Sequence, residues 1–217
     1  MNETIIRYLT MAIVVVTALP VHEAAHGWAA DRLGDHTARD AGRLTLNPMA
    51  HLDLFGSLAL VLFGFGWAKP VPINPSRMRK PRSGLVLTAL AGPFSNLLMA
   101  GAVMVIFKFY LHFGNTATSS GILFTQIIYT VLQTNLTLAV FNLLPVPPLD
   151  GSTLLTALLP VSWRMKLHKY ERVFHVILIL LLYLGVLQIP MNIAAEVLFS
   201  GLNWATAGVD FLLQLLG

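Results

Sequence analysis

Long apolar stretches separated by short polar segments dominate this 217-residue chain. The first stretch, residues 4–33, has no charged side chain between Tyr8 and Val21 and is long enough to cross a hydrocarbon core of about 30 Å as a helix. Similar stretches lie at 83–113 and 121–141, and shorter ones at 152–159, 173–187 and 191–216. We therefore expect a bundle of membrane-spanning helices, in which the last stretch either spans the membrane or lies along its interface.

Residues 44–74 interrupt this pattern. The segment carries several glycines and prolines, and its longest apolar run, 54–67, is short for a span. We expect a re-entrant hairpin with extended or β pieces. Irregular backbone at membrane depth is tolerated only where it is buried in protein or lines a wet cavity. The segment is therefore expected to border the functional site.

Composition places the chain in the membrane and excludes several other classes of protein. Hydrophobic residues make up 56% and charged residues 11% of the chain, whereas ordinary soluble domains are about 25% charged. No cysteine occurs, which rules out disulfides, thiolate metal sites and cysteine nucleophiles. The first apolar stretch superficially resembles a secretory signal, but we expect it to be retained as the first helix.

The formal net charge of +4 is explained by membrane topology, and we expect no nucleic-acid partner. Of the 14 Lys and Arg residues, all but Arg7 and Lys108 fall in the segments 31–43, 67–82 and 161–172. Cytoplasmic loops carry an excess of these residues. The three segments are therefore predicted to lie on the cytoplasmic side of the cell membrane, in a multi-pass protein.

The segment His22-Glu23-Ala24-Ala25-His26 is the strongest chemical signal in the sequence. Residues four apart share one face of a helix, with Cβ atoms about 5–6 Å apart, so both imidazoles can reach one Zn²⁺. Glu23 lies beside the first imidazole, where a carboxylate can take the proton of a water that zinc has acidified. Ionisable groups in an apolar span are costly unless paired or bound to metal, which disfavours a chance match. This site would lie one to two turns from the cytoplasmic end of the helix.

A catalytic zinc site usually has three protein ligands and one open position, and Asp150 is the best candidate for the third. It lies in a stretch that Pro145, Pro147 and Pro148 prevent from forming a continuous helix. The alternative is that Asp150 caps the helix that starts near Ser152. An incomplete pair of histidines in the same membrane favours ligation.

The chain resembles the site-2 protease family of intramembrane zinc metalloproteases, in its compact prokaryotic branch without a PDZ domain. The His-Glu-x-x-His-Gly sequence at 22–27 matches the family's first motif, and the Asn-x-x-Pro-x-x-x-Leu-Asp-Gly sequence at 142–151 matches its second. Segments 42–48, 69–74 and 91–96 are similar as well. The resemblance implies that the zinc ligands are His22, His26 and Asp150. It also implies Glu23 as general base and places Asn142 near the substrate carbonyl.

Four other polar residues have less specific predictions. Asn142 either stabilises an oxyanion or ties off the broken backbone around it. His51 and Asp53 either line the cavity or, more in keeping with their place after a turn, lie at the interface or behind the ligands. Asn96, in the middle of a span, is expected to hydrogen-bond a neighbouring helix.

These observations predict an all-α polytopic membrane protein with about five to six transmembrane helices. A re-entrant or β-hairpin segment and a proline-broken helix would line a buried zinc site. A single domain is expected over 1–217, with a catalytic core over about 4–160 and C-terminal helices over about 170–217.

The expected activity is hydrolysis of peptide bonds in or near transmembrane segments of membrane-protein substrates, as in regulated intramembrane proteolysis, with one Zn²⁺ per chain. A substrate helix must unwind first, because its peptide groups are hydrogen-bonded internally. The 44–76 hairpin could then offer a strand edge to the unwound segment. The alternative is a non-catalytic membrane zinc-binding protein or zinc carrier. A transporter ranks below both, because the two halves of the chain show no repeat.

Overall fold

The computed structural model describes residues 3–63 and 66–216. These ranges form helices and irregular connections, with no β-strand among them. Three helices are long and apolar enough to cross a membrane: α1 (Glu3–Arg32), α5 (Pro81–Phe113) and α6 (Ser119–Asn142). They confirm the helices predicted at 4–33, 83–113 and 121–141, so the protein is a polytopic helical membrane protein.

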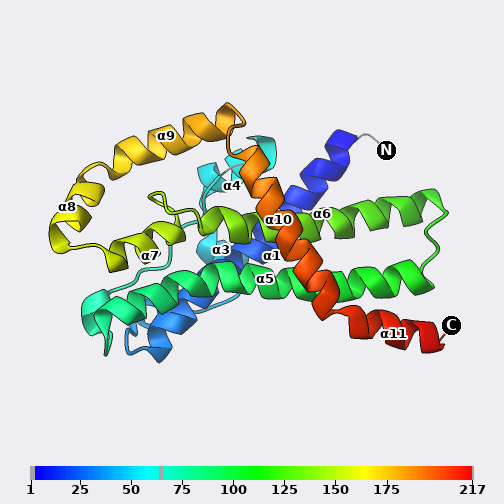
Figure 1. Ribbon diagram of the computed structural model, residues 1–217, viewed down its shortest axis with the longest axis horizontal. Coiled ribbons are helices and arrows are strands. Elements are labelled where there is room, and N and C mark those ends of the chain that lie inside the picture. Colours follow the sequence, from blue (N-terminus) through cyan, green and yellow to red (C-terminus); the bar gives the residue numbers. More distant parts are fainter. Residues whose placement is uncertain (1–2, 64–65, 217) are drawn as a thin grey trace.

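The three long helices pack together as the core of the molecule (Figure 1). α5 and α6 run antiparallel side by side, α1 packs against both, and α10 (Gln188–Ala205) crosses them obliquely. Close approach of the helices rests on small residues that face larger apolar ones. The buried cluster between α5, α6 and α10 consists of Ala100, Met104, Leu132, Leu136 and Ala195.

Local sequence explains where the long helices begin and end. α1 ends before Gly34, whose φ of +106° is in the region that favours glycine. α5 starts with Pro81 at its first position, where the missing N–H has no helical partner to lose. α6 is capped by Thr118, whose hydroxyl accepts a hydrogen bond from the Gly121 amide at 3.1 Å.

Shorter helices connect and follow this core. Between α1 and α5 lie α2 (Thr37–Asp40), α3 (Pro48–His51), α4 (Leu54–Phe63) and a 3₁₀ turn, η1 (Pro75–Arg77). After α6 come α7 (Asp150–Leu158), α8 (Val161–Lys169), α9 (Glu171–Tyr183), α10 and α11 (Ala207–Leu216). α7 packs against α5, which brings the chain after the proline-rich break back onto the core.

Segment 44–74, predicted as a re-entrant hairpin with extended or β pieces, contains an extended stretch and also two short helices that were not predicted. Its described residues contain the helices α3 and α4 and an extended stretch after Trp67, without a β-ladder. Asn47 caps α3 through the Met49 amide at 3.1 Å, and Asp53 caps α4 through the Gly56 amide at 2.8 Å. These caps stabilise helix starts that the glycines and prolines of the segment conceal in the sequence.

The prediction of about five to six transmembrane helices stays a prediction, because the described residues contain three or four candidate spans by length and composition. Three helices are long enough, or four if α9 and α10, which are bent by 82° relative to each other, form one broken span. The predicted stretch 191–216 is divided at Thr206 into α10 and α11, and the basic segment 161–172 forms α8 rather than a loop. Short helices of this kind cannot cross about 30 Å alone.

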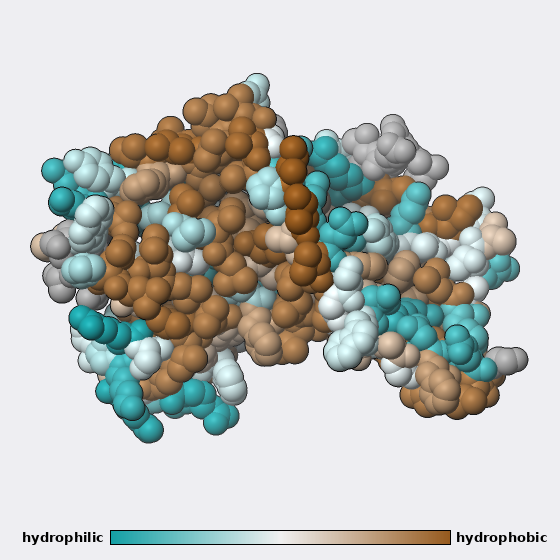
Figure 2. Space-filling model, viewed as in Figure 1, coloured by the Kyte–Doolittle hydropathy of each residue, from teal (hydrophilic) through white to brown (hydrophobic). Residues whose placement is uncertain are grey.

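The outer surface is largely apolar. Figure 2 shows apolar residues over the centre and much of the left half of one face, with hydrophilic residues at the left and lower left edges and across the right half. Val176 and Tyr183 of α9 and Val197 and Trp204 of α10 are more than half exposed. Apolar side chains that face outward on membrane helices are expected to contact lipid.

One buried charge lies on the outer part of this fold. Lys108 of α5 donates to the Asn203 and Thr206 carbonyls, both at 3.3 Å, and to Asp210 Oδ2 at 2.5 Å. The ammonium therefore binds two carbonyls at the end of α10 and pairs with α11. This contact fastens the C-terminal helices to the core.

Candidate metal centre

The helix α1 presents both histidines of the first motif toward the core. His22 and His26 are each 6% exposed. Their rings meet edge to face with centroids 4.6 Å apart, and the two Nε2 atoms lie 3.0 Å apart. One helical turn therefore places two imidazole nitrogens at a single point, as the spacing predicts.

Asp150 reaches the same point from α7, which starts at this residue. Its Oδ2 lies 3.2 Å from Nε2 of His22 and 3.3 Å from Nε2 of His26. The three ligand atoms lie within 4.8 Å of one another. The capping position of α7 is Leu149, and no side chain forms a cap there. The carboxylate is thus directed at the imidazoles rather than at the helix start.

The outer ring nitrogens define which atoms of the cluster carry protons. His26 Nδ1 lies 2.7 Å from the Thr88 carbonyl, and His22 Nδ1 lies 2.5 Å from Asn96 Oδ1. Both partners are acceptors, so each neutral imidazole carries its proton on Nδ1 and has a bare Nε2. Asp150 Oδ2 is buried without a hydrogen-bond donor. Three ligand atoms that converge on one point with these tautomers suit a cation, and two histidines with one carboxylate fit Zn²⁺ with one open position.

Glu23 is held beside this cluster by backbone. Its Oε2 accepts a hydrogen bond from the Val71 amide at 2.9 Å. Val71 belongs to the extended stretch after Trp67 and is 6% exposed. The stretch thereby fixes the position of the carboxylate. Without this hydrogen bond, the flexible side chain of Glu23 would have no fixed position.

The extended stretch is itself anchored at both ends. The Lys69 amide donates to the His51 carbonyl at 2.8 Å, and Arg43 donates to the Lys69 carbonyl at 2.7 Å. At the other end the Asn74 amide donates to Asp35 Oδ2 at 2.5 Å. Residues on both sides of Val71 therefore hold the backbone that positions Glu23.

Asp35 is the main anchor of this stretch and lies outside the spanning helices. It is fully buried, and its Oδ1 accepts hydrogen bonds from the Thr37 hydroxyl at 2.5 Å and the Thr37 amide at 3.1 Å. Burial by itself raises the pKa of Asp35. The hydrogen bonds from Thr37 and Asn74, together with the charge of Arg77, outweigh that effect and hold the pKa below its usual value.

The lowered pKa of Asp35 predicts a pH-dependent contribution to stability. We expect Asp35→Asn to lower the free energy of unfolding by about 1.5–3 kcal/mol at neutral pH, because charged acceptors are lost. Since the pKa is depressed in the folded state, this difference should persist above the unfolded value of about 3.9 and vanish as pH falls through the folded value. Thermal unfolding of both proteins between neutral and acidic pH measures it. A difference that is constant with pH would contradict the assignment.

The hydrogen bonds of the remaining predicted residues do not involve the cluster. Asn142 donates to the Leu138 carbonyl of its own helix at 3.0 Å. This bond lies within the last turn of α6, and both predicted roles of Asn142, at an oxyanion or at the broken backbone around it, stay predictions. His51 is fully buried and bonds the Thr45 carbonyl at 2.7 Å. His51 and the capping residue Asp53 both bond within segment 44–74, and their predicted place at the interface or behind the ligands stays a prediction.

The structure adds residues that the sequence did not assign to the cluster. Asn96 does contact a neighbouring helix, as predicted, but its partner on α1 is His22. Thr88 contributes only its carbonyl and Val71 only its amide, and any residue type can supply these groups. Gly92 matters because it lacks a side chain: a Cβ there would lie 2.5 Å from Cε1 of His26. Among these residues, Asn96 was the one that the sequence could indicate, as a polar residue within a membrane span.

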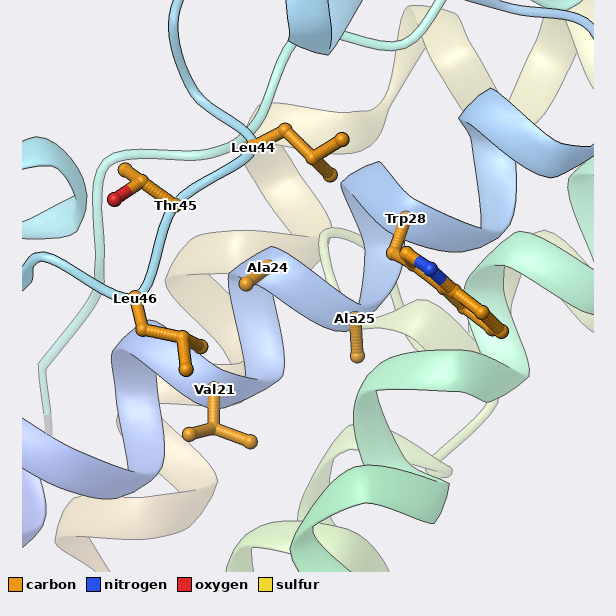
Figure 3. A pocket seen from close by; sticks show the side chains of 7 residues that line it. All are labelled: Val21, Ala24, Ala25, Trp28, Leu44, Thr45 and Leu46. Atoms are coloured by element: carbon orange, nitrogen blue, oxygen red, sulfur yellow. The ribbon is translucent and has the colours of Figure 1, made fainter.

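A separate apolar groove of about 460 Å³ lies on another side of α1 (Figure 3). Its walls are the side of α1 that carries Trp28 and the extended residues 44–46. By helical spacing this side is turned away from His22 and His26. The lining residues are Val21, Ala24, Ala25, Trp28, Leu44, Thr45 and Leu46. The groove therefore contains no member of the cluster.

Comparison with known proteins agrees with this geometry. The family model described as "Peptidase family M50" matches residues 10–185. The Bacillus subtilis (strain 168) protein "Putative zinc metalloprotease YwhC" is 38% identical over 208 residues, which is 94% of this chain and 90% of that protein. No solved structure matches the chain.

Two mycobacterial proteins named "Putative zinc metalloprotease Rip2" are similar over a smaller part. The protein from Mycolicibacterium smegmatis is 31% identical over 62% of this chain, and that from Mycobacterium tuberculosis (strain H37Rv) is 32% identical over 63%. This chain spans 51% and 52% of their lengths, respectively. Together with the cluster of two histidines and one aspartate on apolar helices, these matches show that the chain belongs to peptidase family M50, the site-2 protease family, and is a membrane zinc metalloprotease.

Proposed function

We propose that the protein cleaves peptide bonds in or near transmembrane segments of other membrane proteins, in regulated intramembrane proteolysis. His22, His26 and Asp150 would hold the zinc ion, and Glu23 would act as general base. The observation that carries the proposal is the position of the cluster. Both histidines lie on Ile6–Arg32, a helix long and apolar enough to span, so the reacting bond has to be brought to membrane depth.

Each residue of the site has a defined task in this proposal. Zinc bound there supplies a Lewis acid that polarises a carbonyl and acidifies water. Glu23, held by the Val71 amide through Oε2, accepts the proton from the attacking water and passes it to the leaving amine. The buried Nδ1 contacts of His22 and His26 keep both rings in one orientation. The chain thus supplies a base fixed by backbone and ligands fixed by buried partners.

The extended stretch 67–74 is a candidate binding surface for the substrate. Pro70 and Pro72 have no N–H and keep the stretch from joining a helix. An unwound substrate segment has free backbone N–H groups, which the carbonyls of an extended neighbour can accept. We infer that the substrate chain lies alongside this stretch, which also places Glu23. The predicted re-entrant character of segment 44–76 and its exact relation to the bilayer belong to this proposal.

The proposal also includes the orientation of the molecule in the cell membrane. Residues 31–43, 67–82 and 161–172, which hold most of the Lys and Arg residues, lie toward the left end of Figure 1, away from both termini. Basic residues favour the cytoplasmic side. From His26 to Arg32 the helix rises about 9 Å. The metal centre would therefore open toward the cytoplasm, close enough to the surface for water to enter.

A non-catalytic zinc carrier is the alternative function. Metal binding requires only His22, His26 and Asp150, and a further half-buried carboxylate inside a span is costly without a purpose. Glu23 is moreover bound by the Val71 amide beside the cluster. This arrangement favours a hydrolase over a carrier.

The test is cleavage of a purified transmembrane reporter in liposomes by wild type and by Asp150→Ala. Reporters with an intact apolar helix and with a helix-breaking Gly-Pro pair in its centre are compared, and the cut position is mapped by mass spectrometry. We expect cleavage within or next to the span, faster for the broken helix, and none with Asp150→Ala. Cleavage only in soluble loops, or equal cleavage by Asp150→Ala, would overturn the proposal.

A further inference from the structure

Two buried asparagines connect the metal centre to a helix that supplies none of its ligands. Asn96 of α5 and Asn135 of α6 are both fully buried. A buried amide costs free energy unless its donors and acceptors are satisfied. Two such residues within helices that span the membrane are therefore expected to have a specific purpose.

The hydrogen bonds of the pair run in a single direction. Asn135 Nδ2 donates to the Val131 carbonyl at 2.9 Å, and this carbonyl can only accept. Asn135 Oδ1 must then face outward, where it accepts from Asn96 Nδ2 at 3.3 Å. Asn96 Oδ1 in turn faces His22 Nδ1 at 2.5 Å. A reversed amide at either position would set two acceptors or two donors against each other.

We propose that Asn96 and Asn135 form a directional hydrogen-bond relay, starting at the Val131 carbonyl, that fixes the tautomer and ring orientation of His22. The relay forces the imidazole proton onto Nδ1 and leaves Nε2 free to face His26 and Asp150. It rests on the proposed role of His22 as a zinc ligand. Both asparagines are positioning residues, because they act through the imidazole and touch neither metal nor substrate.

The two histidines of the cluster are thus fixed by different devices. His26 Nδ1 bonds the Thr88 carbonyl directly, and a backbone carbonyl cannot reverse its role. His22 depends on a side-chain amide, whose oxygen and nitrogen exchange places when the side chain flips. Asn135 is needed to prevent that flip. Without it, Asn96 could present an N–H to Nδ1, which would drive the proton onto Nε2 and block the metal position.

The test measures the zinc affinity of purified protein by competition with a chelator, which requires no substrate. Asn135→Leu is expected to weaken zinc binding about 10–100-fold, although Asn135 does not contact His22. Asn96→Asp should keep binding, because a carboxylate accepts from Nδ1 in either orientation. In the Asn96→Asp background, Asn135→Leu should cause no loss of affinity, because the carboxylate needs no partner to hold its orientation and the facing acceptor Asn135 Oδ1 is removed. Ring ¹⁵N shifts of His22 in metal-free protein should show the Nε2 proton only in Asn135→Leu.

The matched control is Gln133→Leu, an amide-to-leucine change two residues away whose side chain bonds the Tyr129 hydroxyl. It should leave zinc affinity unchanged. An equal loss from Asn135→Leu in both backgrounds would indicate a packing role and overturn the relay, as would no loss in either. Failure of wild-type protein to bind zinc would instead refute the proposed function, so the two outcomes are distinguishable.

Discussion

Glu23→Gln is expected to lower the rate of peptide cleavage about 10²–10⁴-fold while zinc binding stays intact. Glutamine has a carbonyl oxygen that can still accept the hydrogen bond that the Val71 amide gives to Glu23. The substitution therefore preserves the position of the side chain and removes only its ability to take a proton. Initial rates on a transmembrane reporter, normalised to bound zinc measured by mass spectrometry, report this change.

The control for this prediction is Glu196→Gln on α10, an exposed glutamate remote in sequence from the motif. It should cleave at the wild-type rate. If Glu23→Gln retained activity within about twofold, the general base would have to be another group. If it lost zinc along with activity, Glu23 would be a ligand or a structural residue instead.

Gly92→Ala is expected to lower zinc affinity and activity together. A Cβ at this position would lie 2.5 Å from Cε1 of His26 and 2.6 Å from Cε1 of His22, well inside van der Waals contact. Both rings would have to shift from the positions in which they meet Asp150. Overpacking of this kind costs about 1–3 kcal/mol, which corresponds to roughly 5–150-fold in zinc affinity. Chelator competition and zinc content after dialysis measure the loss.

Gly101→Ala provides the matched comparison on the same helix. A Cβ there would lie 3.6 Å from Leu202 Cδ2, which is an ordinary contact. This variant should bind zinc normally and be slightly more stable, because alanine favours helix by about 0.5–1 kcal/mol over glycine. Equal zinc affinity in the two alanine variants would show that the site tolerates a methyl group at Gly92.

The long helices could be predicted from the sequence because a membrane span requires a continuous apolar run. The predicted ends of α1, α5 and α6 lie within about two residues of those observed. The short helices could not be predicted equally well. α4 contains a glycine, and α8 contains several charged and polar residues. The basic residues of α8 indicate the side of the membrane on which it lies, but they do not indicate a helix, so a loop was predicted. Their helical form depends on caps and neighbours outside the local window.

The residues that carry the chemistry of the site could also be predicted from local sequence patterns. The spacing of His22 and His26 is a property of one helix, and Asp150 follows a break that prolines impose on any fold. What brings them together is the packing of α7 against α5 and of α5 against α1. Segment 44–74 was expected near the site because of its irregular backbone. The group that positions Glu23 is the Val71 amide, and a backbone amide cannot be recognised from the residue type.

By itself, the sequence determined the membrane environment, the positions of α1, α5 and α6, and the residue types able to bind zinc and accept a proton, since hydropathy and helical spacing act over short range. Only the tertiary structure decided which groups fix those residues. The Thr88 carbonyl, the Val71 amide, the asparagine pair behind His22 and the space left by Gly92 all act between segments distant in the chain. Contacts of that kind depend on how helices pack, and packing is set by the whole molecule rather than by any one stretch of it.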